Sequence, residues 1–166
     1  MTLLKGRAFK FGDDISTDLI IAGKYAHLRS NLPELAKHAM EDANPEFIKL
    51  VRPGDFIVAG SNFGLGSSRE HAPLVIKMAG VSAILAGSFA RIFFRNAINQ
   101  GVPALICPTD KIADGDALEI SLDEGLIRDI TRNETYSFTK IPQTMLNILN
   151  EGGLIPYVNR HGDLKL

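Results

Sequence analysis

The chain has 166 residues, 45% of them hydrophobic and 22% charged, and its formal net charge is −1. This size and composition are typical of one globular domain that buries its own core, so we expect a single domain over residues 1–166. The near-neutral charge argues against a nucleic-acid partner, and the absence of an apolar run of about 18–20 residues argues against a membrane span. The sequence also lacks a signal-peptide pattern, which argues against secretion, so a cytoplasmic location is expected.

Apolar periodicity and turn residues predict alternating strands and helices up to residue 106. In chain order, the expected elements are a strand at Arg7–Phe11, helices at Pro33–Met40 and Glu46–Leu50, a buried strand at Phe56–Ala59, a helix ending near Ala79, a strand at Val81–Ala86, a helix at Phe89–Asn99 and a strand at Ala104–Ile106. Strands that alternate with helices predict a βαβ core with parallel pairing.

Beyond Cys107 the pattern changes to short alternating segments. We expect antiparallel strands at Ala117–Ser121, Leu126–Ile130 and Thr135–Phe138, followed by a final helix at Gln143–Asn150. The predicted fold class is therefore α/β, a single domain with a mixed sheet.

Cys107 is the only cysteine in the chain. A single cysteine excludes an intrachain disulfide, and it excludes an iron–sulfur centre held by this chain alone, because such a centre needs several thiolate ligands. The histidines have no spacing typical of a metal site. The sequence therefore predicts no metal or cofactor bound by this chain, and Cys107 is expected to be a small apolar residue at a strand end.

The segment most informative about chemistry is residues 60–71, GSNFGLGSSREH, which follows a predicted buried strand. Gly64 and Gly66 allow tight turns and the close approach of a ligand to the backbone. Arg69 adds a guanidinium that can bind a carboxylate through two parallel hydrogen bonds. The segment therefore predicts an anion-binding loop.

Ser67 and Glu70 have the Ser-x-x-Glu spacing of a capping box, which predicts that Ser67 caps a helix. The N–H groups and positive dipole end of such a helix would suit a carboxylate or phosphate. Pro73 leaves a second possibility open, in which the regular helix begins only near His71–Pro73 after an irregular turn. The alternative to an anion site is a capped helix on which Arg69 and Glu70 are merely solvated.

Three other loop motifs do not fit this segment. A phosphate-binding P-loop needs a lysine between Gly66 and Ser67, a dinucleotide fingerprint starting at Gly64 needs a small residue where Arg69 stands, and the Gly-x-Ser-x-Gly nucleophile elbow is absent. The segment is therefore not a P-loop, a dinucleotide-binding loop or a nucleophile elbow.

Residues 64–72, GLGSSREHA, and residues 87–96, GSFARIFFRN, resemble the swivel domain of the aconitase superfamily, with the small subunits of isopropylmalate dehydratases and homoaconitases as the nearest members. Residues 11–18, FGDDISTD, and the turn at residues 51–55, VRPGD, fit the same pattern. The resemblance spans nearly the whole chain. It implies a single swivelling β/β/α domain like the C-terminal domain of aconitase.

The resemblance implies that this chain supplies half of an active site. In that family a hydroxy-dicarboxylic acid loses water and regains it with the opposite regiochemistry, and a larger partner subunit holds a [4Fe–4S] cluster. By motif, Ser67 matches the catalytic base, and Ser68 and Arg69 match residues that bind the substrate carboxylate. Supporting roles are expected for Asp18, Gly64, Gly66, Ser88 and Arg91, the last two as residues that cap and brace the following helix.

Residues 21–30, IAGKYAHLRS, resemble the aconitase segment that carries a substrate-binding arginine, which would be Arg29. The resemblance makes Tyr25, His27 and Leu28 a specificity loop, although this run is longer than the Tyr-Leu-Arg common in isopropylmalate enzymes. Leu28 suits an aliphatic substituent and Arg29 a carboxylate. The alternatives are that Arg29 is a surface charge on a loop and that Asp18 caps a turn instead of pairing with an active-site arginine.

The remaining histidines carry little functional signal. We expect His71 to be a structural hydrogen-bonding residue, and His38 and His161 to be solvated.

Two hypotheses follow. The first is a small subunit that isomerises 2-isopropylmalate to 3-isopropylmalate in leucine biosynthesis, in a heterodimer or heterotetramer with an iron–sulfur large subunit; homoaconitase and 2,3-dimethylmalate dehydratase are the close competitors. The second is a non-catalytic anion-binding module. A homo-oligomer of the isolated chain, if one forms, is expected to use apolar surface meant for the large subunit.

Overall fold

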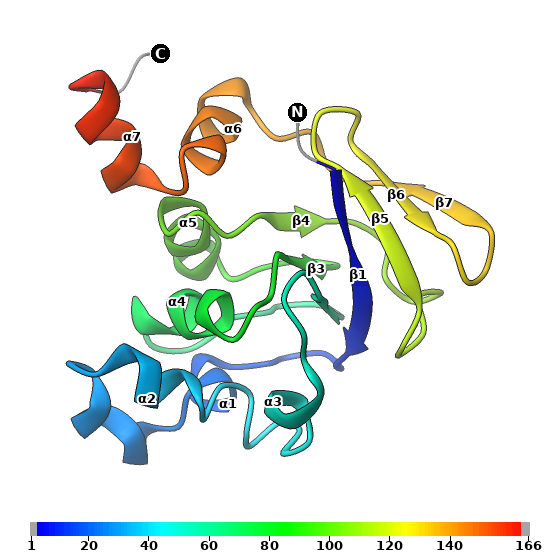
Figure 1. Cartoon of the computed structure of the whole chain (residues 1–166). Helices are drawn as coiled ribbons and strands as arrows, with labels where there is room; N and C mark the ends of the chain where they lie inside the picture. Colours follow the sequence, from blue (N-terminus) through cyan, green and yellow to red (C-terminus); the bar gives the residue numbers. More distant parts are fainter. Residues whose placement is uncertain (1–2, 164–166) are drawn as a thin grey trace.

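The computed structural model describes residues 3–163 and contains one mixed sheet of seven strands in the order β4-β3-β2-β1-β5-β6-β7. The strands are β1 (Leu3–Lys10), β2 (Phe56–Ala59), β3 (Ala83–Ala86), β4 (Ala104–Ile106), β5 (Ala117–Ser121), β6 (Leu126–Asp129) and β7 (Glu134–Ser137). The helices are α1 (Thr17–Ile20), the 3-10 helix η1 (Gly23–Leu28), α2 (Leu32–Ala36), α3 (Phe47–Leu50), α4 (His71–Met78), α5 (Arg91–Asn99), α6 (Gln143–Asn150) and α7 (Leu154–His161). Figure 1 shows α1, α2 and α3 at one end of the molecule and α6 and α7 at the other.

Strand β1 belongs to both halves of the sheet. Its second half pairs in parallel with β2, where Ala8 lies opposite Phe56, and its first half pairs antiparallel with β5, where Leu3 lies opposite Ser121. Strands β2, β3 and β4 continue in parallel, whereas β5, β6 and β7 form an antiparallel meander. The expected parallel core and antiparallel appendage are thus confirmed, as two parts of one continuous sheet.

Both faces of β2 are buried. Phe56 and Val58 pack into one hydrophobic cluster with Leu85 of β3, whereas Ile57 and Ala59 pack into the other cluster on the opposite face. Successive side chains of a strand point to opposite faces, so an unbroken apolar run is what a parallel strand covered on both sides requires. This is why the sequence predicts β2 and β4 with the correct bounds.

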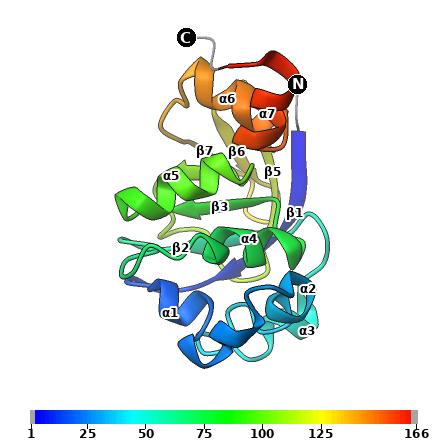
Figure 2. The same cartoon turned by 90° about the vertical axis from the view of Figure 1, so that its left-hand side faces the viewer.

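The loops that follow β1, β2 and β3 leave the sheet at the same edge, because these strands are parallel. Backbone hydrogen bonds join them: Gly60 N–H donates to Gly12 O at 3.1 Å, and Gly87 N–H donates to Gly60 O at 2.9 Å. Figure 2 shows α4 and α5, which follow two of these loops, in front of the parallel strands. Ligands of open α/β sheets bind at this kind of edge, beyond the carboxyl ends of the strands.

Two helix bounds differ from the expected ones for local reasons. Helix α2 ends at Ala36 instead of Met40, and Met40 has a left-handed backbone with φ of +60° that is incompatible with a continuing helix. Helix α5 begins at Arg91 instead of Phe89, because Phe89 forms a parallel β-bridge with Phe63 and is held extended.

Three helices were missed by the sequence analysis, namely α1, η1 and α7. The expectation that the chain's last helix is α6 is therefore wrong. Gly153, with φ of +136°, interrupts the helical backbone between α6 and α7. Pro156 lies in the first turn of α7, where proline is tolerated because a backbone N–H at that position would have no helical partner.

Candidate active site

The loop after β2 is held in place by side chains of the two neighbouring loops. Asp13 Oδ1 accepts a hydrogen bond from Ser61 N–H at 2.8 Å, and Ser88 Oγ accepts one from Asn62 N–H at 2.7 Å. Ser88 therefore braces this loop, and the expectation that it caps α5 is wrong. The N-cap position of α5 is Ala90, which provides no side-chain hydrogen bond.

Gly64 occupies a position that only glycine fits. Its φ is +85°, and a Cβ atom there would lie 2.2 Å from Cγ of Phe93. Its N–H donates to Ile15 O at 2.7 Å, which ties the loop to the segment before α1. The aromatic ring of α5 and the backbone of residue 15 thus fix the path by which the chain reaches Ser67.

The predicted capping box is wrong, and the alternative with a later helix start is confirmed. Helix α4 begins at His71, and its N-cap position is Glu70, which makes no side-chain capping bond. Ser67 lies in an exposed turn before the helix, where its carbonyl accepts hydrogen bonds from Arg69 N–H at 2.9 Å and from Thr17 Oγ1 at 3.1 Å. These partners replace the helical hydrogen bond that a capping serine would have accepted.

The hydroxyl of Ser67 lies beside a fixed guanidinium. Arg69 Nε donates to Ser67 Oγ at 3.1 Å, and Arg69 Nη1 donates to Ile21 O at 2.8 Å. Asp18 Oδ1 lies 3.2 Å from Arg69 Nη1 and also accepts a bond from Gly23 N–H at 3.2 Å. The Asp18 side chain is 69% exposed, so this ion pair orients Arg69 more than it stabilises the fold. A positive group oriented in this way stabilises negative charge on the serine oxygen.

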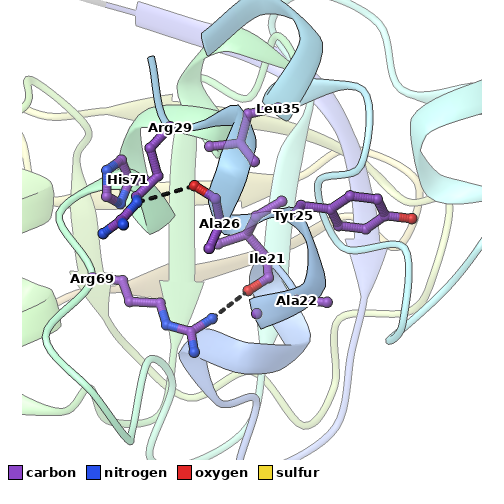
Figure 3. Close-up of a pocket in the computed structure, with 9 residues that line it drawn as sticks. Ile21, Ala22, Tyr25, Ala26, Arg29, Leu35, Arg69 and His71 are labelled. Carbon is purple, nitrogen blue, oxygen red and sulfur yellow. Dashed lines mark hydrogen bonds between the residues drawn. The ribbon is translucent and has the colours of Figure 1, made fainter. Parts of the chain in front are cut away.

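Two pockets meet at Arg69. The first, here called the serine pocket, has a volume of about 220 Å³ and is lined by Thr17, Gly64, Gly66, Ser67, Ser68, Arg69, Ala90, Arg91, Ile92, Phe93 and Asn96. The second, here called the arginine pocket, has a volume of about 230 Å³ and is lined by Ile21, Ala22, Gly23, Tyr25, Ala26, Arg29, Leu35, Arg69 and His71. Figure 3 shows that Arg29, Arg69 and His71 gather on one side of the arginine pocket.

The predicted specificity loop is only partly in contact with these pockets. Tyr25 lines the arginine pocket, but its ring stacks on His38 at 3.8 Å and its hydroxyl donates to Glu41 at 3.0 Å, so the phenol points away from Arg69 (Figure 3). Desolvation and the bond to Glu41 raise the pKa of Tyr25, and the bond with His38 lowers the pKa of Glu41. Leu28 packs against the hydrophobic core, and His27 is exposed.

The structure brings together most of the residues that the motifs single out. Ser67, Ser68 and Arg69 share the serine pocket with Arg91, and Arg29 lies in the adjoining pocket, where its Nε donates to Ala26 O at 3.0 Å. Their roles in binding and catalysis stay predictions, because geometry alone does not test them.

Two histidines were expected to be solvated, and this prediction is wrong. His38 Nδ1 lies 2.6 Å from Glu41 Oε2, and His161 Nε2 lies 3.3 Å from Glu151 Oε1. Glu41 lies three positions after His38, a helical or turn spacing that could have signalled the pair, whereas Glu151 lies ten positions before His161 and is brought to it by the fold.

Two residues of the site were not predicted from the sequence. Thr17 is buried, and its Oγ1 lies 3.5 Å from Ser67 Oγ in addition to its bond to the Ser67 carbonyl. His71 was expected to make a structural hydrogen bond, but it lines the arginine pocket and its side chain has no hydrogen bond or ion pair within residues 3–163. No sequence signal links Thr17 to a serine 50 positions away.

The described part of the chain offers no alternative site built on a metal or a reactive thiol. Within residues 3–163 there is no group of three or more histidine, cysteine, aspartate or glutamate side chains placed to hold a metal ion. Cys107 is buried, and burial raises the pKa of its thiol to about 12. In the same range, no helix is long and apolar enough to cross a membrane.

Comparison with known proteins identifies close relatives. The family model of the aconitase C-terminal domain matches residues 16–109. The 3-isopropylmalate dehydratase small subunit 2 of Archaeoglobus fulgidus is 64% identical over 161 residues, which cover 97% of this chain and 98% of that protein. Small subunit 1 of 3-isopropylmalate dehydratase from Thermotoga maritima is 56% identical over 161 residues, which cover 96% of this chain and 97% of that protein.

A solved structure shares the fold over nearly its full length. The crystal structure of a 3-isopropylmalate dehydratase from Methanocaldococcus jannaschii matches with a TM-score of 0.93 and 46% sequence identity, covering 97% of this chain and 96% of that one. The expected α/β swivel-type fold is thus confirmed. The matched model, the relatives and the shared architecture together show that this chain belongs to the aconitase C-terminal domain family.

Proposed function

We propose that this chain is the small subunit of a hydro-lyase that isomerises 2-isopropylmalate to 3-isopropylmalate by dehydration and rehydration in leucine biosynthesis. The names of relatives that are up to 64% identical over nearly the whole chain support this assignment. The observation that carries it is the Ser67–Arg69 pair, at 3.1 Å, where two small pockets meet.

In the proposed mechanism, Ser67 is the base that takes a proton from the substrate carbon next to a carboxylate, and it returns a proton during rehydration. A free serine hydroxyl is far too weakly acidic to be ionised near neutral pH, so the alkoxide needs stabilisation. Arg69 supplies it, because its Nε–H already points at Ser67 Oγ and its Nη1 is bound to Ile21 O. Closure of the site by a partner would exclude water and strengthen this interaction.

The substrate carboxylates would be bound by Arg69, Arg29 and Ser68. Arg69 has one guanidinium nitrogen, Nη2, with no hydrogen bond to the described chain, and Arg29 uses only its Nε for Ala26 O. Both guanidinium groups thus retain N–H donors for an anion. The short distance between Ser67 and Arg69 would hold the substrate's α-carbon near the base.

The proposal includes a large subunit that carries a [4Fe–4S] cluster, in a heterodimer or a heterotetramer in the cytoplasm. The residues of this chain do not fit such a cluster, because its one cysteine is buried with a pKa of about 12 and thiolate ligands must be ionised. The rim of the serine pocket is open to a partner: Ser67 and Arg91 are exposed, and Ile92 keeps 53% of its surface exposed.

The test is a hydration–dehydration assay on isopropylmalate, homocitrate-type and dimethylmalate-type acids. It compares the chain alone with the chain mixed with its anaerobically reconstituted large subunit. Activity in the mixture only, highest with isopropylmalate and abolished by Ser67→Ala, is expected. A preference for another acid would reassign the substrate to homoaconitase or dimethylmalate dehydratase chemistry. No turnover of any acid by a confirmed complex would reject the proposal and favour an anion-binding module.

A further inference from the structure

The arginine pocket has an excess of positive charge. Three of its nine lining residues, Arg29, Arg69 and His71, can carry positive charge, and none of the nine is acidic. Arg29 has no ion pair within residues 3–163, and the exposed Asp18 offsets only part of the charge of Arg69. Exposed ion pairs are weak, so the pocket favours an anion.

His71 differs from the chain's two paired histidines. His38 and His161 each contact a glutamate, whereas His71 is half-buried at the start of α4 and its ring has no hydrogen bond within the described chain. Figure 3 shows His71 and Arg29 on the same side of the pocket that both residues line. The ring N–H of His71 is therefore available as a donor to a ligand in the pocket.

The remaining lining residues of the arginine pocket form an apolar wall. Ile21 and Leu35 are buried core residues, and Ala22 and Ala26 add small side chains (Figure 3). A pocket of about 230 Å³ that is cationic on one side and apolar on the other suits a small acid with a short aliphatic branch.

We propose that His71 is a specificity-determining substrate contact in this pocket. Its ring N–H donates a hydrogen bond to the carboxylate that Arg29 and Arg69 also bind, while the aliphatic branch next to that carboxylate lies against Ala26 and Leu35. The identity of the substrate rests on the proposed function. The role of His71 is additional to it, and it fixes which end of the acid enters the arginine pocket.

The experiment measures the binding of isopropylsuccinate to the complex assembled with the large subunit, by calorimetric titration. This acid has the two carboxylates and the branch but neither a hydroxyl group nor a double bond, so binding is independent of turnover. His71→Leu removes the ring N–H donor and puts an apolar side chain of similar size in its place. We expect its Kd to rise roughly 10- to 100-fold, the effect of losing a hydrogen bond to a charged group. His71→Gln retains an N–H donor and should recover part of this loss.

Matched variants separate a contact from a structural effect. His161→Leu replaces a histidine on α7, far from the pocket residues in sequence. It should leave the Kd within about twofold of the wild type, because it removes contacts with Glu151 and Tyr157 only. Succinate, which lacks the branch, should lose as much affinity as isopropylsuccinate in His71→Leu, whereas Leu35→Ala should weaken isopropylsuccinate more than succinate. If His71→Leu does not associate, His71→Phe supplies a ring without a donor.

Three results would overturn the proposal. They are an unchanged Kd in His71→Leu, no binding of isopropylsuccinate by the wild-type complex, and equal losses in the leucine and glutamine variants together with a lowered melting temperature. The catalytic assignment is tested separately by turnover and Ser67→Ala. A complex that binds isopropylsuccinate through His71 but turns over no acid would reject the proposed function alone.

Discussion

Replacing Asp129 by asparagine is expected to stabilise the protein at pH values above the folded pKa of Asp129. Asp116 lies directly before β5 and is 3% exposed, and Asp129 is the last residue of β6 and is 1% exposed. Burial and the hydrogen bond with Asp116 raise the pKa of Asp129. Burial opposes the ionisation of Asp116 as well, but hydrogen bonds from Asp129, Ala113 and Arg132 outweigh it and lower that pKa. Between the two folded pKa values the pair therefore keeps one proton, on Asp129, which can donate it to ionised Asp116.

The two carboxyl groups give opposite pH dependences. The contribution of Asp129 to stability is fully present below its unfolded pKa of about 3.9 and is lost as the pH rises through its higher folded value. The contribution of Asp116 is present above about 3.9 and is lost as the pH falls through its lower folded value. Ionised Asp129 leaves its buried Oδ2 without a hydrogen-bond partner, and such an atom costs about 1–3 kcal/mol.

Asparagine can donate to Asp116 at every pH, so the variant should gain about 1–3 kcal/mol above the folded pKa of Asp129 and nothing below about 3.9. For a domain of this size, each kcal/mol corresponds to a rise of about 2–4 °C in Tm. Urea unfolding of both proteins at a series of pH values measures the difference. As a control, Asp116→Asn should destabilise the protein above about 3.9, because it removes the 2.8 Å bond from Arg132 to a charged oxygen. Identical pH profiles for wild type and Asp129→Asn, or a less stable variant at alkaline pH, would refute the shared proton.

Three further outcomes are expected. Arg69→Lys should lower kcat/KM of the assembled enzyme roughly 10- to 100-fold, since lysine has one nitrogen in place of the separate Nε and Nη1 donors that bind Ser67 Oγ and Ile21 O; an unchanged rate would remove Arg69 from the mechanism. Gly64→Ala should cost about 2–5 kcal/mol in urea unfolding, because φ of +85° is strained for alanine and its Cβ would meet Phe93 at 2.2 Å. Cys107 should resist alkylation at mildly alkaline pH in the native protein and react after unfolding, because burial raises its pKa to about 12; rapid labelling of the native protein would contradict this burial.

The sheet was predictable because its signals are local. β2 and β4 are uninterrupted apolar runs between turn residues, and such runs have few alternatives once both of their faces are covered. Helix α7 was missed because Gly152, Gly153 and Pro156 all signal an interruption, and only its packing against α5 and α6 makes it regular. Tertiary contacts of this kind cannot be inferred from propensity.

The site was predictable by motif but not by local geometry. The capping-box spacing of Ser67 and Glu70 is a real helix signal, yet Ser67 lies in a turn. That turn is stabilised by a hydrogen bond from Thr17 Oγ1 to Ser67 O, and Thr17 lies 50 positions earlier in the chain. The same holds for His71. Its place in the arginine pocket depends on how η1 packs against α2 and how α2 packs against α4, and no spacing in the sequence encodes those contacts.

The position of β1 across both halves of the sheet has a consequence for synthesis on the ribosome. The partner of its second half, β2, emerges early, but the partner of its first half, β5, emerges only after the whole parallel half, and Lys10 N–H likewise bonds Asp114, 104 positions away. Until then the first half of β1 is an unpaired strand edge on a nascent chain, a state prone to misassembly. Chains truncated before β5 should therefore depend on chaperones, and completion of β5 is the step that releases the protein from that dependence.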